Sequence, residues 1–206
     1  MTYLLRLALL CTVASVGELS ARTMEVYPFT GETVSVGAPM IMGEGRAGLE
    51  QLVSFFMESN PEADQSRVRM LASLYLEECA IEGVNWDVAF VQMCLETGFL
   101  RFGGLVTEGM NNFCGLGATG PDSRGHTFPD AGTGVRAHVQ HLKAYGSTEP
   151  LVGECVDPRF HFVDPRGMSP DVAGLSGTWA ADGQYGRKLT DLLEALYSRT
   201  SPAASE

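Results

Sequence analysis

The 206-residue sequence has few basic residues: 14 Lys and Arg stand against 25 Asp and Glu, which gives a formal net charge of −11. A chain this acidic lacks the basic surface that neutralises phosphates, so no nucleic acid is expected as a partner. An anionic membrane surface is disfavoured for the same reason. A largely uncharged substrate, such as a carbohydrate, is compatible with this composition.

Motifs for metals and organic cofactors are also missing. The sequence contains no Cys-x-x-Cys and no His-x-x-x-His pair, so no zinc site is expected. The run Gly115–Gly120 matches the spacing of a dinucleotide-binding loop, but no apolar strand precedes it and Pro121 stands where a helix should begin. His138 and His141 have no further ligands in view and are interpreted as ordinary helix residues. We therefore expect no metal and no cofactor.

No apolar run reaches the roughly 20 residues that a membrane span needs. Near the N-terminus, Arg6 is followed by an apolar stretch from Leu7 to Val16 and then by small residues up to Ala21. This is the three-part pattern of a secretory signal peptide. Residues 1–21 are therefore predicted to be a signal peptide, and we expect a secreted, periplasmic or cell-envelope protein without a stable membrane anchor.

The dense cysteine pattern of small disulfide-stapled proteins is absent. Five cysteines occur, and Cys11 belongs to the predicted signal peptide. The others are Cys79, Cys94, Cys114 and Cys155. An even number in an exported chain allows two disulfides, but free buried cysteines are also common, so both arrangements stay open.

Strand-like alternation is scarce, and helical spacing dominates the chain. Residues 22–48 are rich in glycine and are predicted to be a linker or loosely packed arm; residues 49–199 form the predicted domain, and 200–206 a disordered tail. Helices are expected from Leu49 to the stop at Asn60, and over 64–82, 86–97, 133–145 and 185–197, with a loop over 99–130. Short strands are considered only near 152–156 and 160–163.

Several residues of the C-terminal half are given structural roles at this stage. The helix residues Arg136, Lys143, Arg187 and Lys188 are interpreted as solvated positions. Trp179 is interpreted as an aromatic residue of the core or of a cleft wall, in preference to a binding platform.

Glu96 stands near the end of an expected helix, just before the stop at Gly98. Ala89 and Met93 lie on the same helical face, so the carboxylate is next to apolar surface. Burial and the negative end of the helix dipole both disfavour the charged form and raise the pKa. A carboxylic acid that stays protonated can donate a proton to a glycosidic oxygen. From periodicity alone, a solvated glutamate at a helix end is the usual case.

A glycine-rich loop follows and contains Asn111, Asn112 and Phe113. Paired amides can hydrogen-bond sugar hydroxyls and an acetamido group while an aromatic ring packs on a sugar face. These residues are therefore predicted to bind substrate. The alternative is a turn, which asparagine favours.

The string Leu95–Phe99, followed by Asn111–Gly117, resembles the signature of the bacterial endo-β-N-acetylglucosaminidases of glycoside hydrolase family 73. That signature is similar to a glutamate closely followed by a glycine at a helix end, here Glu96 and Gly98, and then Asn-Asn-(Phe/Leu)-x-Gly-apolar-Gly. The resemblance covers residues 49–197 and continues in the segments Phe128–Asp130, Gly134–Tyr145 and Trp179–Gly186.

The resemblance implies a mainly α (α+β lysozyme-like) fold: a helical, two-lobed domain with a substrate cleft and little or no β-sheet. It implies an exported hydrolase that cleaves peptidoglycan glycan strands at the GlcNAc-β-1,4-MurNAc bond. Glu96 matches the family's proton donor, and Tyr185 resembles a cleft tyrosine of the family. We expect the protein to act as a monomer.

The sequence departs from the family in the segment after the asparagine pair. Many members have a β-hairpin there that carries a second acid, but here only residues 118–127 precede Phe128, and no carboxylate matches by motif. Asp122 and Asp130 are the candidates for a second acid.

A reaction with a single protein acid is also open. In substrate-assisted hydrolysis, the acetamido oxygen attacks its own anomeric carbon, so no second carboxylate is needed as nucleophile. An N-acetylmuramidase or a lytic transglycosylase on the same fold, and a non-catalytic glycan-binding module, are the alternative functions.

Overall fold

The structure, a computed structural model, describes residues 38–120 and 122–198. The chain divides into two units, residues 1–35 and 36–206, and every described residue lies in the second unit. The predicted signal peptide, most of the predicted arm and the predicted tail lie outside the described residues.

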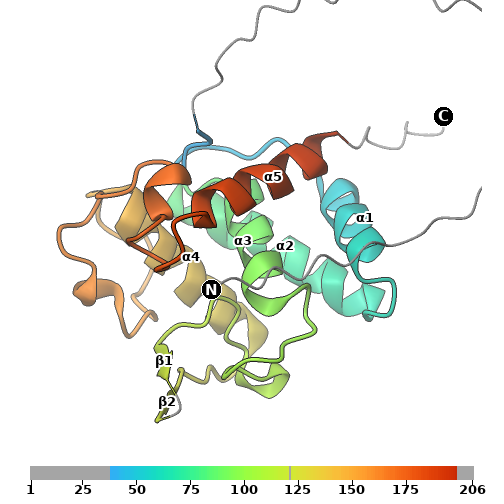
Figure 1. Cartoon of the computed structure of the whole chain (residues 1–206), viewed down its shortest axis with the longest axis horizontal. Coiled ribbons are helices and arrows are strands. Elements are labelled where there is room, and N and C mark those ends of the chain that lie inside the picture. Colours follow the sequence, from blue (N-terminus) through green and yellow to red (C-terminus); the bar gives the residue numbers. More distant parts are fainter. Residues whose placement is uncertain (1–37, 121, 199–206) are drawn as a thin grey trace, which may run out of the picture. The chain divides into compact units, whose positions relative to one another are not determined.

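Helices dominate the described part of the chain (Figure 1). The α-helices are α1 (Leu49–Ser59), α2 (Gln65–Glu82), α3 (Trp86–Thr97), α4 (Ala131–Gly146) and α5 (Tyr185–Tyr197). Three short 3-10 helices are η1 (Glu108–Met110), η2 (Phe160–Phe162) and η3 (Ala173–Leu175). The strands β1 (Ala118–Gly120) and β2 (Ser123–Arg124) pair antiparallel. The expected mainly helical fold with little β-sheet is confirmed.

Local capping accounts for the boundaries of α2 and α3. The side chains of Asp64 and Asn85 accept hydrogen bonds from backbone N–H groups in the first turns of α2 and α3, respectively. The two helices end at Gly83 and Gly98, whose φ angles are 71° and 58°. Glycine favours this left-handed conformation because it has no side chain to clash. The sequence predicts both helices correctly because these signals are local.

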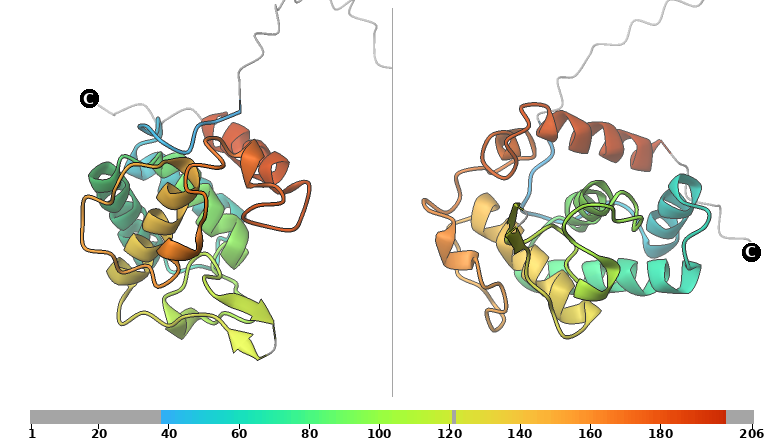
Figure 2. Two further views of the ribbon diagram at one scale, coloured as in Figure 1. Left: turned by 90° about the vertical axis from the view of Figure 1, so that its left-hand side faces the viewer. Right: turned by 60° about the horizontal axis from the view of Figure 1, so that its bottom comes forward.

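The helix α3 lies at the centre of the described fold. It contacts α1, α2, α4 and α5 and lies between them in Figure 2. Residues 87–94 are all buried, so α3 is enclosed on every side rather than along one apolar stripe. The ring of Phe56 on α1 packs edge to face against the ring of Phe90 on α3, with centroids 6.3 Å apart. Glu96, in the last turn, is the one residue of α3 that is classed as exposed.

Residues 38–48 pack against the helices, so the prediction of a loosely packed arm is wrong for this segment. Ile41 and Ala47 are buried in the main core. The carboxylate of Asp87, at the start of α3, accepts hydrogen bonds from the backbone N–H groups of Arg46 at 2.6 Å and Ala47 at 3.2 Å. Backbone hydrogen bonds, such as that from the N–H of Ile41 to the carbonyl of Pro170 at 2.9 Å, also hold this segment. None of these contacts produces a periodic pattern in the sequence.

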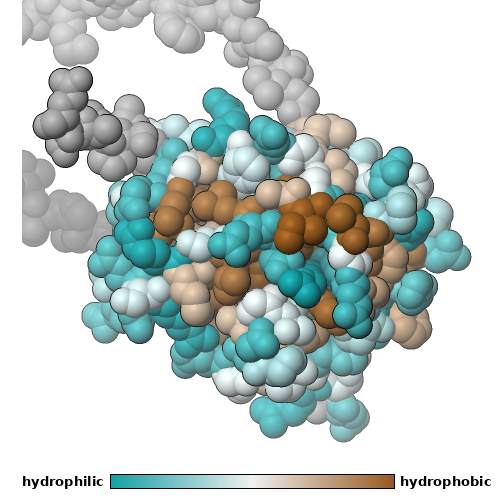
Figure 3. Space-filling model, turned by 180° about the vertical axis from the view of Figure 1, so that it is seen from behind, coloured by the Kyte–Doolittle hydropathy of each residue, from teal (hydrophilic) through white to brown (hydrophobic). Residues whose placement is uncertain are grey.

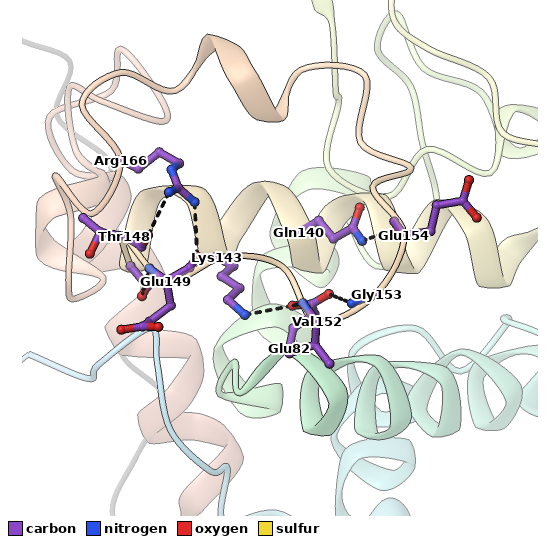
Figure 4. Close-up of polar contacts among 10 residues, drawn as sticks. Glu82, Gln140, Lys143, Thr148, Glu149, Val152, Gly153, Glu154 and Arg166 are labelled. Atoms are coloured by element: carbon purple, nitrogen blue, oxygen red, sulfur yellow. Dashed lines mark hydrogen bonds and ion pairs between the residues drawn. The ribbon is translucent and has the colours of Figure 1, made fainter.

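A buried ion pair joins α2 to α4 (Figure 4). Lys143 Nζ lies 2.8 Å from Glu82 Oε2, and both residues are 3% exposed. The same carboxylate accepts hydrogen bonds from the N–H groups of Val152 at 3.0 Å and Gly153 at 3.1 Å. Burial alone would raise the pKa of Glu82, but Lys143 and these two N–H groups lower it overall. The prediction that Lys143 is solvated is therefore wrong.

The two segments considered as short strands are not strands. The backbone of residues 152–156 is paired with side chains instead of a neighbouring strand. Gln140 donates to the carbonyl of Glu154 at 2.8 Å (Figure 4). Gln140 also accepts from the N–H of Val156 at 2.8 Å. Residues 160–162 form η2. Buried polar side chains thus satisfy the backbone of this long connection.

The other predicted solvated cations divide into two groups. Arg136 donates to both carboxylate oxygens of Glu78, a residue that is 7% exposed. Arg187 and Lys188 are exposed on α5, as expected, and pair with Asp191 and Asp182.

The cysteines that remain after the predicted signal peptide are free thiols. Cys79, Cys94 and Cys114 are buried, and Cys155 is exposed. Of the two arrangements left open by the sequence, disulfides or free cysteines, the structure therefore has free cysteines. Burial raises the pKa of each buried thiol, which keeps it protonated and unreactive.

Apolar side chains on the surface are dispersed. On the face seen in Figure 3, hydrophobic residues form a broken band interrupted by hydrophilic ones. Val152 and Phe162 are the most exposed of the large hydrophobic residues described, at 71% each. No helix within residues 38–120 and 122–198 has the length and apolar character needed to cross a membrane.

Replacing Lys143 by Met is expected to lower the free energy of unfolding by about 3–5 kcal/mol, because Glu82 would stay buried without its cation. Urea unfolding followed by circular dichroism measures the change. Arg187→Met, which removes an exposed charge, is the control and should remain close to the wild type. A loss no larger than that of the control would contradict the structural role of the buried pair.

Candidate active site

Glu96 faces an open cleft with a volume of about 380 Å³. The walls come from the end of α3, the following segment up to Val106, the 112–118 loop and Trp179. Solvent reaches Glu96 through the open side, while protein atoms surround the carboxylate on its other sides. Burial raises the pKa of Glu96, and hydrogen bonds from Tyr185 and Trp179 offset part of the rise. The expected rise of this pKa is confirmed.

The two carboxylate oxygens of Glu96 have different surroundings. Oε1 accepts one hydrogen bond from Trp179 Nε1 at 3.1 Å and another from the hydroxyl of Tyr185. Oε2 accepts none from the described residues and lies beside Gly115, where an added Cβ would come to 3.9 Å from it. Because Oε1 is already occupied by two donors, a proton on this carboxyl group belongs on Oε2. The acidic proton is therefore held on the side of Gly115, a residue that lines the cleft.

Tyr185, the first residue of α5, belongs to a line of buried hydrogen bonds that connects four helices. Gln92 Nε2 on α3 donates to the Tyr185 hydroxyl at 2.9 Å. Gln92 Oε1 lies 3.0 Å from His138 Nε2 on α4, and His138 Nδ1 lies 2.8 Å from the hydroxyl of Tyr75 on α2. None of the four residues is more than 5% exposed. We call these four residues the polar line.

Each bond of the polar line has one available direction. The Gln92 oxygen can only accept, so His138 carries its proton on Nε2 and accepts from Tyr75 at Nδ1. Burial lowers the pKa of His138 to about 3, so the ring is neutral at neutral pH, as this arrangement requires. Since Tyr185 receives the N–H of Gln92, its own proton points to Glu96. The polar line thereby keeps Tyr185 a donor to Oε1.

Trp179 forms a cleft wall, one of the two positions expected for it, and is held by rings on α4. Its ring centroid lies 5.9 Å from that of His138, 5.2 Å from that of His141 and 5.3 Å from that of Tyr145. The two histidines therefore support the site, and the interpretation as ordinary helix residues missed this role. Their spacing places them near one side of α4, but their partners lie elsewhere in the sequence.

The chain turns sharply directly after Glu96. Gly98, Phe99 and Leu100 have φ angles of 58°, 55° and 60°. A left-handed conformation costs about 1–3 kcal/mol for a residue other than glycine. Asn60 compensates by donating from its side chain to the carbonyl of Phe99 at 2.8 Å. This turn directs the following segment into the cleft wall.

The asparagine–phenylalanine motif builds the loop beside Glu96. Asn112 is 1% exposed; its amide N–H groups donate to the carbonyls of Leu116 and His126, and its oxygen accepts from Leu116 N–H. Phe113 is 0% exposed and belongs to the main core. Asn112 lines the cleft, but the loop uses its amide group, and the core encloses the ring of Phe113. Contact of either residue with the substrate stays a prediction.

Asn111 adopts the turn conformation that was the alternative reading of the motif, with φ of 49°. Its side chain donates to the carbonyl of Phe128 at 3.1 Å. The side chain is half-buried and keeps its oxygen unused among the described contacts, so binding of substrate by Asn111 stays a prediction.

The two candidates for the second acid do not line the cleft of Glu96. Asp130 accepts a hydrogen bond from Thr133 N–H at 2.7 Å as the N-cap of α4, which lowers the pKa of Asp130. Asp122 is exposed at the turn of the short β1–β2 hairpin. Asp130 thus has a structural role, and a catalytic role of Asp122 stays a prediction.

Carboxylates and metal-ligating groups are sparse around the cleft. Glu96 is the sole Asp or Glu among the described residues that line it. Across residues 38–120 and 122–198, no three His, Cys, Asp or Glu side chains gather in a way that could hold a metal ion. The chemistry that this arrangement supports is proton transfer by one carboxylic acid.

A helical fold with one hydrogen-bonded carboxylic acid in an open cleft can perform acid catalysis, which glycosidases use. The sequence matches the glucosaminidase family, described as mannosyl-glycoprotein endo-beta-N-acetylglucosaminidase, over residues 72–198, and the chain belongs to this family. A relative from Borreliella burgdorferi, described as an uncharacterized protein, is 43% identical over 158 residues, which cover 77% of each chain. No solved structure matches the chain.

Replacing Tyr185 by Phe is expected to raise the pKa of Glu96, because the hydrogen bond from Tyr185 lowers it. The carboxyl carbon of Glu96, followed by nuclear magnetic resonance during a pH titration, reports this directly and needs no substrate. Tyr145→Phe is the matched control, since the Tyr145 hydroxyl bonds to the carbonyl of Thr178. An unchanged or lower pKa in the Tyr185 variant would rule out the assigned hydrogen bond.

Replacing Gln92 by Met keeps the approximate shape of the side chain but interrupts the polar line. The variant leaves buried groups of His138 and Tyr185 without partners, so the free energy of unfolding is expected to fall by about 1–3 kcal/mol. Chemical denaturation measures it, with Gln184→Met at an exposed position as the control. Wild-type stability in the Gln92 variant would contradict the polar line.

Proposed function

We propose that the chain is an exported, monomeric peptidoglycan hydrolase that cleaves the GlcNAc-β-1,4-MurNAc bond with Glu96 as general acid. The observation that carries the proposal is the asymmetric Glu96 carboxyl group, with Oε1 bonded to two donors and Oε2 beside the cleft. Family membership supports a glycosidase acting on such glycans. Export rests on the sequence pattern of residues 1–21.

In the first step, Oε2 of Glu96 gives its proton to the glycosidic oxygen while the bond from that oxygen to the anomeric carbon breaks. Glu96 becomes a carboxylate, and its negative charge is stabilised by the N–H of Trp179 and the O–H of Tyr185 on Oε1. Both donors are in position before the reaction. Since the protonated form is the active one, activity should fall as the pH rises through the raised pKa of Glu96.

In this proposal a group of the substrate itself acts as the nucleophile. Because Glu96 is the sole carboxylate among the described cleft residues, the acetamido oxygen of GlcNAc attacks its own anomeric carbon. Water then opens the resulting ring, with the Glu96 carboxylate as general base, and the configuration at the anomeric carbon is retained. The amide oxygen of Asn111, which the described contacts leave unused, is the proposed acceptor for the N–H of the acetamido group. Inversion, detected as the anomer of the first product, would exclude this route and favour a second acid such as Asp122.

Replacing Glu96 by Gln should reduce the hydrolysis of purified peptidoglycan by about 10²–10⁴-fold, because the general acid is lost while the shape of the cleft is kept. Clearing of a wall suspension measures activity, and pelleting with insoluble wall measures binding, which should persist. Glu62→Gln, at an exposed position, is the matched control.

The other outcomes of this experiment separate the alternative functions. New reducing ends on GlcNAc support the proposed bond, whereas MurNAc or anhydro-MurNAc ends would indicate a muramidase or a lytic transglycosylase. A wild-type protein that binds the wall without clearing it would indicate a glycan-binding module.

A further inference from the structure

A second hollow, with a volume of about 200 Å³, adjoins the cleft of Glu96. The two share wall residues, namely Cys114, Gly115, Ala118 and Trp179. A glycan strand that passes Glu96 can therefore continue into this hollow. We call it the Arg159 hollow, because the rest of its lining includes Arg159 and Phe162, with His141 and Tyr145 from α4.

The Arg159 hollow carries positive charge that the described residues do not neutralise. No Asp or Glu is found among the described residues that line it, although the whole chain has a net charge of −11. Arg159 has no carboxylate partner in the described part of the chain, in contrast to Arg136 and Arg187. Its Cζ atom lies 4.9 Å from the centroid of the Phe162 ring, which supports one face of the guanidinium and leaves the N–H edge for a ligand.

Buried side chains fix the backbone that carries Arg159. The N–H of Arg159 donates to Asp157 Oδ1 at 2.8 Å, and Asp157 Oδ2 lies 2.8 Å from His141 Nδ1. Gln140 accepts from the N–H groups of Val156 at 2.8 Å and Asp157 at 3.2 Å. Asp157 is 3% exposed and Gln140 is 0% exposed. The carboxylate nearest in sequence is therefore used to hold the chain and does not pair with the guanidinium.

We propose that the Arg159 hollow binds a carboxylate on the muramoyl side of the glycan, on either the lactyl group or the attached peptide. The inference rests on the proposed function for the identity of the glycan. A guanidinium edge matches a carboxylate through two parallel N–H···O bonds. A local cation is needed for such a ligand, because an acidic chain otherwise repels it. Arg159 is thus assigned as a specificity residue, and Glu96 as the catalytic one.

The test measures binding, so that it does not depend on turnover. The dissociation constant of the Glu96→Gln protein is measured for three strands: peptide-free strands with free lactyl carboxylates, the same strands with these groups converted to methyl amides, and strands that keep their peptides. Adding Arg159→Gln should weaken binding of one carboxylate-bearing strand by about tenfold and leave the amidated strand unchanged. The strand affected identifies the lactyl group or the peptide as the source.

Two controls accompany the test. Arg159→Lys keeps the positive charge but loses the paired N–H donors of the guanidinium, so it should recover part of the affinity. Arg187→Gln removes an equal charge at an exposed position on α5 and should have no effect. The difference between Arg159 and its Gln variant should shrink as the salt concentration rises.

Equal weakening on all three strands, no weakening on any, or no binding at all would overturn the inference. The proposed function fails separately. A wild-type protein that shows the expected binding pattern but cleaves nothing would remove the hydrolase proposal and keep the carboxylate site. If the wild type cleaves peptidoglycan normally and Arg159→Gln does not change binding, the hydrolase proposal stands and the carboxylate site is excluded.

Discussion

The enclosure of α3 by four other helices is the constraint on which the rest of the structure depends. A helix buried on every side cannot shift or rotate without disturbing the whole core, so the groups that it carries have fixed positions. Gln92 lies in its middle and Glu96 on its exposed last turn. The core thus delivers one carboxyl group to the surface with its orientation already determined, and the nearby loops need only form a cleft around it.

Burial also forces the polar groups inside this core to pair. Tyr75, Gln92, His138 and Tyr185 satisfy one another within the protein, which is the condition for burying them without a large penalty. Each hydrogen bond of the polar line has one possible direction. The core therefore determines that the hydroxyl proton of Tyr185 points to Glu96. The hydroxyl of Tyr185 is both the last group of the polar line and a hydrogen-bond donor to Glu96. The packing of the core therefore affects the pKa of Glu96 at the surface.

Local signals in the sequence predict a large part of this fold, and distant contacts explain what they miss. Caps at Asp64 and Asn85 and stops at Gly83 and Gly98 define α2 and α3, and the end of α3 places Glu96. The bonds of the polar line join residues 46 to 93 positions apart, and the Lys143–Glu82 bond spans 61. The periodicity of apolar residues in the sequence gives no information about hydrogen-bond partners so far apart. The burial of Phe113 is not evident from the sequence, because a buried aromatic residue and a sugar-binding one look alike in a short motif.

A close contact between Gly134 on α4 and the loop that contains Asn111 and Phe113 affects the shape of the cleft. A Cβ atom on Gly134 would come 1.8 Å from the carbonyl oxygen of Asn111 and 3.3 Å from the Phe113 ring, so the loop rests directly on the bare backbone of the helix. Glycine weakens a helix interior by roughly 0.5–1 kcal/mol relative to alanine, and here the close approach accounts for its presence. Any side chain would push the loop, and Gly115 with it, relative to Glu96. Gly134 therefore sets the separation between α4 and the loop, so a residue outside the cleft lining helps to fix the position of the cleft wall at Gly115.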